Sequence, residues 1–281
     1  MLILVIKFFM SLGSVPPTNW IMFAKQTVIV LVAAVALPAV LMAMFLTRKP
    51  AQTLKLRVCS VPVACAAILA ACFLHPAATW LTNLVMEIYP PSGDLALLEQ
   101  LMSAIFADAP GFWAILLVLA LAPAILEELA FRGFILSGMQ SVGNSLKAIV
   151  ITSLFFGLAH SILQQSIITF FLGCILGFIA VRTKSLIPCI LYHMTHNSIS
   201  TAMSFATAES LQTYPVWKFL LQSTESGSFE YRLLPAILMT IAGCLLLLWF
   251  WKYDSVAAEE RESRRDLSYG LDTGSVKAAA K

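Results

Sequence analysis

Three charged residues stand together inside a long apolar segment, and their spacing divides them into a pair and a single carboxylate. Glu127, Glu128 and Arg132 lie within residues 112–138, where nearly all other side chains are apolar. An ionisable group at the centre of a membrane helix costs about 2.5–3.5 kcal/mol, so such groups persist where they pair or line a cavity. In a helix, a glutamate four residues before an arginine is the favoured order for an ion pair. The spacing therefore pairs Glu128 with Arg132 and leaves Glu127 without a partner on its own turn.

Histidine and asparagine residues occur in two further apolar segments. His160 ends one of them, and His193 and Asn197 are four residues apart in the next, so both project from one helical face. His196, three residues after His193, is interpreted as a hydrogen-bonding contact between helices. His75 stands at the end of a predicted span and is interpreted as an interfacial histidine without a catalytic role.

A glutamate, two histidines and an asparagine can hydrolyse an amide bond without a protein nucleophile. A buried carboxylate takes a proton from water, and a histidine helps to position that water. A second histidine and an amide donate hydrogen bonds to a developing oxyanion. The same groups could instead ligate Zn²⁺, with Glu127, His160 and His193 as ligands, and a purely structural ion network is a further alternative. No cofactor is firmly predicted.

Other protease motifs are absent from the sequence. Neither H-E-x-x-H nor G-x-S-x-G occurs, and no Y-D and G-x-G-D aspartate pair is present. A zinc protease of that type, a serine protease and an aspartyl intramembrane protease are therefore disfavoured.

The composition is that of a membrane protein. Of 281 residues, 59% are hydrophobic and 12% are charged, and the mean hydropathy is +0.86. That charged fraction is about half of the share in soluble domains, and disorder needs low hydrophobicity. Long apolar runs without alternation disfavour a β-barrel, and a net charge of +3 is too small to indicate a nucleic-acid partner. We predict an all-α, polytopic transmembrane helical bundle.

About seven spans fit the apolar segments, since a span needs about 20 apolar residues. Residues 112–138 are interpreted as a single kinked helix, in which Pro123 removes one backbone hydrogen bond and frees the carbonyl of Leu119. The glycines of Gly173-x-x-x-Gly177 favour close helix packing. The predicted spans are 27–46, 58–75, 112–138, 147–160, 162–181, 186–205 and 232–251.

Lysine and arginine residues set the predicted orientation, because cytoplasmic loops carry an excess of them. The connection between the first two spans is basic, and so is the one after 162–181, whereas 76–111 contains no Lys or Arg. We predict an integral protein of the bacterial inner membrane with a cytoplasmic polar tail. The sequence also suggests that the polar cavity opens toward the cytoplasm. The basic residues concerned are Arg48, Lys49, Lys55, Arg57, Arg182 and Lys184.

Three parts are expected along the chain. Residues 1–110 would hold N-terminal membrane segments, 111–252 a catalytic helical core, and 253–281 a cytoplasmic tail with a short helix followed by disorder. Within 76–111, two amphipathic interfacial helices are predicted on either side of Pro90 and Pro91. Residues 1–12 are interpreted as an interfacial helix, and Trp217 and Phe219 as interface anchors.

Three short motifs together resemble a known family. E-E-x-x-x-R runs from Glu127 to Arg132, F-x-x-x-H from Phe156 to His160, and H-x-x-x-N from His193 to Asn197. In this order, on three predicted spans, they resemble the CPBP family of intramembrane proteases, which includes CAAX prenyl endopeptidases and bacteriocin-processing homologues. The likeness covers about residues 112–205.

The resemblance implies an intramembrane endopeptidase in which Glu127 activates water with the help of His160. It further implies that His193 and Asn197 form the oxyanion hole. The Glu128 and Arg132 pair would hold the helix geometry.

The resemblance leaves the metal open, because members are described both as metalloproteases and as metal-free glutamate enzymes. It implies a peptide or protein substrate, membrane-anchored in some members, and a lipid bilayer around the protein. Nothing in the sequence identifies a prenylated substrate. Residues 121–126 also resemble bacterial members fused to an ABC-type permease half, which implies association with such a permease.

A different class of function uses the same buried polar groups. A transporter, or an immunity-type protein that binds a peptide without cutting it, would carry protons or ligands on them. Transporters often show inverted repeats with broken helices, and no convincing repeat relates 27–138 to 147–251.

Overall fold

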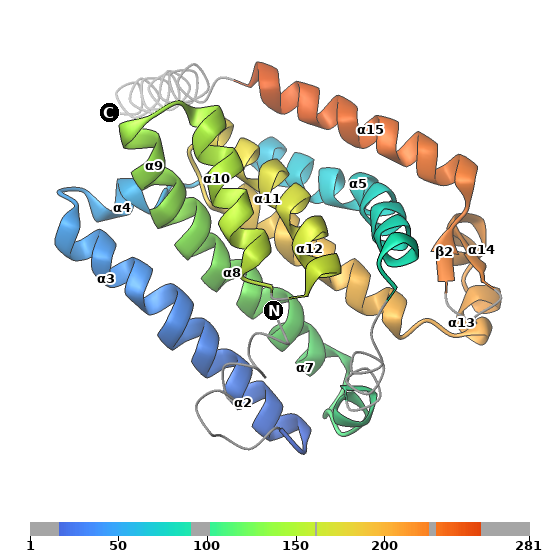
Figure 1. The fold of residues 1–281 in the computed structure, drawn as a ribbon. Helices are drawn as coiled ribbons and strands as arrows, with labels where there is room; N and C mark the ends of the chain where they lie inside the picture. Colours follow the sequence, from blue (N-terminus) through green and yellow to red (C-terminus); the bar gives the residue numbers. More distant parts are fainter. Residues whose placement is uncertain (1–16, 91–101, 161, 225–228, 254–281) are drawn as a thin grey trace, which may run out of the picture.

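The computed structural model of the chain describes residues 17–90, 102–160, 162–224 and 229–253 (Figure 1). These residues form a bundle of helices with one small β-hairpin at its edge, and the predicted all-α polytopic architecture is confirmed apart from that hairpin. The predicted helices in 1–12 and in the C-terminal tail lie outside the described residues, as does much of the second amphipathic helix of 76–111.

The elements follow one another along the chain with short connections. The first half contains α2 (Trp20–Val30), a π-helical segment (Leu31–Ala36), α3 (Leu37–Leu46), α4 (Pro50–Thr53) and α5 (Val61–Ile88). The central part contains α7 (Phe112–Leu116), α8 (Ala122–Glu128), α9 (Leu136–Val142), α10 (Ser145–Leu158), α11 (Leu163–Thr183) and α12 (Ile187–Ser204). The last part contains α13 (Ala208–Thr213), α14 (Pro215–Leu220), the antiparallel strands β1 (Leu221–Ser223) and β2 (Phe229–Tyr231), and α15 (Leu233–Lys252).

All seven segments predicted as spans are helical. Five helices within the described ranges are long and apolar enough to cross a membrane: Trp20–Leu46, Val61–Ile88, Phe112–Val142, Leu163–Thr183 and Leu233–Lys252. Helix α10 has only 14 residues, and α12, with 18, carries several polar side chains. The number of seven spans and the division into three parts therefore stay predictions.

Residues 112–142 form one continuous helix, which confirms the single helix predicted over 112–138 and extends it by four residues. Two π-helical segments, Leu117–Leu121 and Leu129–Ile135, interrupt its α-helical geometry on either side of Glu127 and Glu128. Such π-turns are rare and often occur at functional sites. Irregular backbone is tolerated at membrane depth where the protein buries it.

Small residues let the central helices approach closely. Helix α5 packs against α12 and α15 through buried alanines, including Ala67, Ala70 and Ala71. A Cβ atom at Gly173 of α11 would lie 2.9 Å from the Cβ of Ser153 in α10. The predicted close packing at Gly173 is thus present, as expected where small residues drive helix contact in a membrane.

The first predicted interfacial helix proves to be part of a span. Helix α5 runs through Pro76 to Ile88 without a break. A proline removes a single backbone hydrogen bond, and packing on both faces of α5 keeps the helix intact. The prediction of an interfacial His75 is therefore wrong, because this side chain lies in the middle of α5 and is 3% exposed.

The segment around Lys55, called the strap, contacts two other helices at the basic connections. Lys55, with a positive φ of 51°, donates its Nζ hydrogens to the carbonyl of Arg132 at 3.3 Å and to the hydroxyl of Ser137. Its own carbonyl accepts from the backbone of Leu186 at 3.0 Å. Burial lowers the pKa of Lys55 to about 8. The strap thus ties the connection before α5 to the end of 112–142 and to the start of α12.

The two predicted interface anchors differ in their surroundings. Trp217 packs against the hairpin cluster of Leu221, Tyr231 and Ala236, whereas Phe219 is 67% exposed. Anchoring at the interface stays a prediction for both.

Candidate active site

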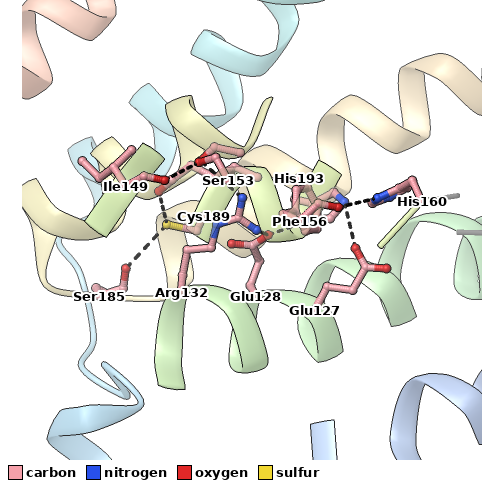
Figure 2. A network of polar contacts seen from close by, with 12 residues as sticks. Glu127, Glu128, Arg132, Ile149, Ser153, Phe156, His160, Ser185, Cys189 and His193 are labelled. Atoms are coloured by element: carbon pink, nitrogen blue, oxygen red, sulfur yellow. Dashed lines mark hydrogen bonds and ion pairs between the residues drawn. The ribbon is translucent and has the colours of Figure 1, made fainter. Parts of the chain in front are cut away.

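Three helices bring the four predicted catalytic residues to one cavity of about 520 Å³. Glu127 stands in the last turn of α8, His160 just after the end of α10, and His193 and Asn197 in α12. All four line the cavity, and Figure 2 shows the side chains of Glu127, His160 and His193 converging.

The ion pair expected from helical spacing is present and fully buried. Arg132 donates from Nη1 to Glu128 Oε1 at 2.7 Å, and the two side chains are 1% and 0% exposed. Arg132 also donates to the carbonyl of Gly173 at 3.3 Å. Its guanidinium carbon lies 4.2 Å from the ring centroid of Phe156, a cation–π contact.

Glu128 has a second partner that the sequence did not indicate. The Nδ1 atom of His193 lies 2.9 Å from the same Oε1 atom of Glu128. Because a carboxylate in an ion pair only accepts, Nδ1 must carry the proton. This contact joins residues 65 positions apart, so no local spacing could reveal it. It fixes the ring of His193 and aims Nε2 at Glu127, 4.0 Å from Oε2.

Glu127 keeps an unused carboxylate oxygen. The residue is 3% exposed, and its Oε1 atom has no hydrogen-bond partner among the residues that the structure describes. Oε2 of Glu128 also has no partner among these residues, so the two glutamates differ in their surroundings: Glu128 is held by an arginine and a histidine, and Glu127 lines the cavity.

His160 is oriented by the first residue of its own motif. Its Nδ1 atom donates to the carbonyl of Phe156 at 2.8 Å, which leaves Nε2 with a lone pair when the ring is neutral. The ring of Phe156 lies 5.0 Å from that of His160 and 5.9 Å from that of His193, both edge-on. Phe156 therefore packs both histidines and Arg132, a role that its sequence position alone did not show.

The amide of Asn197 binds the carbonyl of Leu119, which lies four residues before Pro123. Its Nδ2 atom donates to the carbonyl of Leu119 at 3.3 Å. Pro123, four residues after Leu119, has no N–H to donate there. The carbonyl predicted to be freed by Pro123 thus receives a hydrogen bond from α12, and the second N–H of the amide is left over.

A second polar cluster, not predicted, lies beside the same cavity. His75 is hydrogen-bonded through Nε2 to Ser200 at 2.9 Å and through Nδ1 to the hydroxyl of Tyr231 at 3.1 Å. The ring of His196 lies 4.9 Å from that of His75, and its Nδ1 has no hydrogen-bond partner among the described residues. This cluster joins α5, α12 and the hairpin.

The alternative metal site is not formed by the arrangement of the described residues. Among the described residues, no three His, Cys, Asp or Glu side chains are arranged so that they could hold a metal ion. The Nδ1 atoms of His160 and His193 are engaged by Phe156 and Glu128, so only the Nε2 atoms of these rings remain as possible ligands. No catalytic step is derived through a metal.

Taken as a class, the molecule is a polytopic helical membrane protein with a cavity lined by buried polar side chains. Residues 109–199 match the family model described as Rce1-like, type II CAAX prenyl endopeptidase Rce1-like. This range holds all three motifs, so the match confirms the predicted resemblance to the CPBP intramembrane proteases. It supports a CAAX-type protease that is integral to the membrane. The search of curated proteins and the search of solved structures each gave no match.

Removing the charge of Arg132 and removing that of Glu127 should change the stability of the protein differently. We expect Arg132→Met to lower the free energy of unfolding by about 3–5 kcal/mol, because it leaves the carboxylate of Glu128 buried without its cation. Glu127→Gln is the matched control: it neutralises a carboxylate with an unused oxygen and should leave stability unchanged or higher. Thermal unfolding of the detergent-solubilised protein measures both. Equal losses in the two variants would contradict the assignment.

Proposed function

We propose that the chain is an intramembrane endopeptidase that hydrolyses a peptide bond with a water molecule activated by Glu127. The observation that carries this proposal is the unused Oε1 of Glu127 in a cavity shared with His160, His193 and Asn197. The adjacent carboxylate of Glu128 binds two partners through Oε1 and does not line the cavity, so Glu127 is the carboxylate that a water molecule there would meet.

The first step is the activation of water. A water molecule between Glu127 and Nε2 of His160 gives one proton to the Glu127 carboxylate, while its oxygen adds to the carbonyl carbon of the scissile bond. The lone pair on Nε2 of His160 accepts a hydrogen bond from the same water. No covalent bond forms between substrate and protein.

The second step stabilises and then resolves the tetrahedral intermediate. The free N–H of the Asn197 amide donates to the oxyanion, and Nε2 of His193 donates as well when its ring carries both protons. In that state the charges of Arg132 and His193 balance those of the Glu128 carboxylate and the oxyanion, because Glu127 carries the proton taken from water. Glu127 then returns its proton to the leaving nitrogen, the C–N bond breaks, and a new carboxyl and a new amine result.

The cavity lining fits a polypeptide substrate. Beyond the catalytic residues, apolar side chains alternate with uncharged hydroxyls and amides, such as Thr82, Gln164 and Gln165. These groups suit an extended peptide with uncharged side chains, whether free or membrane-anchored. A prenylated substrate, association with an ABC-type permease and a bacterial inner-membrane location stay predictions.

Cleavage assays on Glu127 variants test the proposal. We expect Glu127→Gln to lower kcat by about 10²-fold or more, because the water loses its base. Glu87→Gln, the same change at an exposed glutamate near the end of α5, should retain full activity. Purified protein in phospholipid vesicles would be tested on quenched-fluorescence peptides of mixed apolar sequence. Full activity of Glu127→Gln would refute the proposed role.

A substitution of Pro123 tests the role of Asn197 without destabilising the protein. In Pro123→Ala a backbone N–H becomes available for the carbonyl of Leu119 and competes with the amide of Asn197. The variant should be more stable, by up to about 3 kcal/mol for a proline removed from a helix interior, and yet have a lower kcat with little change in KM. Thermal unfolding and steady-state kinetics on one preparation check both. Unchanged kcat would argue against positioning of Asn197 by this carbonyl.

A further inference from the structure

One end of the helix bundle is strongly basic. Eight Lys and Arg residues, and no Asp or Glu, belong to the described connections and helix ends at this end. Direct contacts tie these segments together: Lys55 binds the Leu186 backbone, and Arg182 donates to the carbonyl of Phe250 at 3.2 Å. We call this the basic end; its charged residues are Arg48, Lys49, Lys55, Arg57, Lys147, Arg182, Lys184 and Lys252.

The opposite end, called the far end, has mixed charge. Contacts here join the end of α5 to the start of α11, where Gln164 donates to the carbonyl of Tyr89 at 2.8 Å, and the start of α2 to Asp108 at 3.1 Å. Described Lys and Arg residues at this end number three and Asp and Glu residues four: Lys25, Lys218, Arg232, Glu87, Asp108, Glu209 and Glu230.

The cavity occupies the half of the bundle next to the far end. From Glu127 it reaches Thr82 and Met86 in the last two turns of α5 and Gln164 and Gln165 in the first turn of α11. Its wall also includes Ser200 and Thr201 near the C-terminal end of α12. None of its lining residues belongs to the basic connections.

Cytoplasmic connections carry the excess of Lys and Arg, so the basic end marks the cytoplasmic face. Together these observations point to an active-site cavity that opens at the far end, and we infer that its substrate is a polypeptide segment presented from the non-cytoplasmic side. That the segment is a substrate rests on the proposed function, whereas the side on which the cavity opens does not depend on it.

The chemistry of the wall narrows that substrate. Glu127 is the single Asp, Glu, Lys or Arg among the described lining residues. A charged substrate side chain would lose its hydration there without an ion-pair partner. The segment that enters is therefore an uncharged one, solvated by hydroxyls and amides of the wall.

This side of opening differs from the cytoplasmic opening that the sequence suggested. Glu127 lies at the middle of the 31-residue helix Phe112–Val142, so its position alone does not distinguish the two halves. The lining residues on α5, α11 and α12 do.

Thiol labelling tests the side of opening directly. In a background with all six native cysteines replaced, single variants Gln165→Cys and Thr82→Cys place thiols in the cavity, Gln52→Cys at the exposed basic end, and Glu87→Cys at the exposed far end. Spheroplasts are treated with a membrane-impermeant maleimide before and after permeabilisation. We expect the two cavity thiols and Glu87→Cys to react before permeabilisation, and Gln52→Cys only after it.

Every other labelling pattern overturns the inference. Cavity thiols that react only together with Gln52→Cys would place the opening at the cytoplasmic face, and cavity thiols that never react would mean that no water path reaches them. Two cavity positions are used in case one of the variants fails to fold. Folding of each purified variant is checked by its monodisperse elution in size-exclusion chromatography. Labelling needs no catalysis, so the expected labelling pattern together with full activity of Glu127→Gln would refute the proposed function and leave the side of opening intact.

Discussion

One oxygen atom, Oε1 of Glu128, holds the site together. It accepts from Arg132 of its own helix and from His193 of α12, at 2.7 and 2.9 Å. A buried carboxylate without partners would cost several kcal/mol, so this oxygen fixes the distance and rotation between 112–142 and α12. Because Glu128 is held through this oxygen and does not line the cavity, its neighbour Glu127 is the carboxylate that remains for chemistry.

The helix backbone near this oxygen is irregular, and one of its carbonyl groups is bound by a side chain of a neighbouring helix. In hydrocarbon every polar backbone group needs a partner within the protein. The π-segments on either side of the glutamates and Pro123 disturb the regular bonding of the helix, and Asn197 supplies a donor to the carbonyl of Leu119. The helix thus gives up internal regularity and gains a contact with α12, which orients the amide that the proposed oxyanion hole requires.

Much of the architecture could be predicted from local pattern, since hydrophobic length and i, i+4 spacing act within one helix. The continuous helix 112–142, the Glu128 and Arg132 pair and the freed carbonyl of Leu119 all follow from such rules. Contacts between helices do not, and the bond from His193 to Glu128 and the cluster around His75 are examples. At His75 the local rule misled, because Pro76 suggested a helix end while packing of α5 against α12 and α15 kept the helix whole.

Attack by water, with no covalent intermediate, is tested most directly by isotope labelling. A single turnover in H₂¹⁸O, followed by mass spectrometry of the products and of the digested protein, locates the oxygen that enters. If Glu127 activates water, one ¹⁸O atom is expected in the new carboxyl group of the product and none in the protein. An acylated side chain, or ¹⁸O in the peptide that contains Glu127, would show instead that a protein group attacks the substrate.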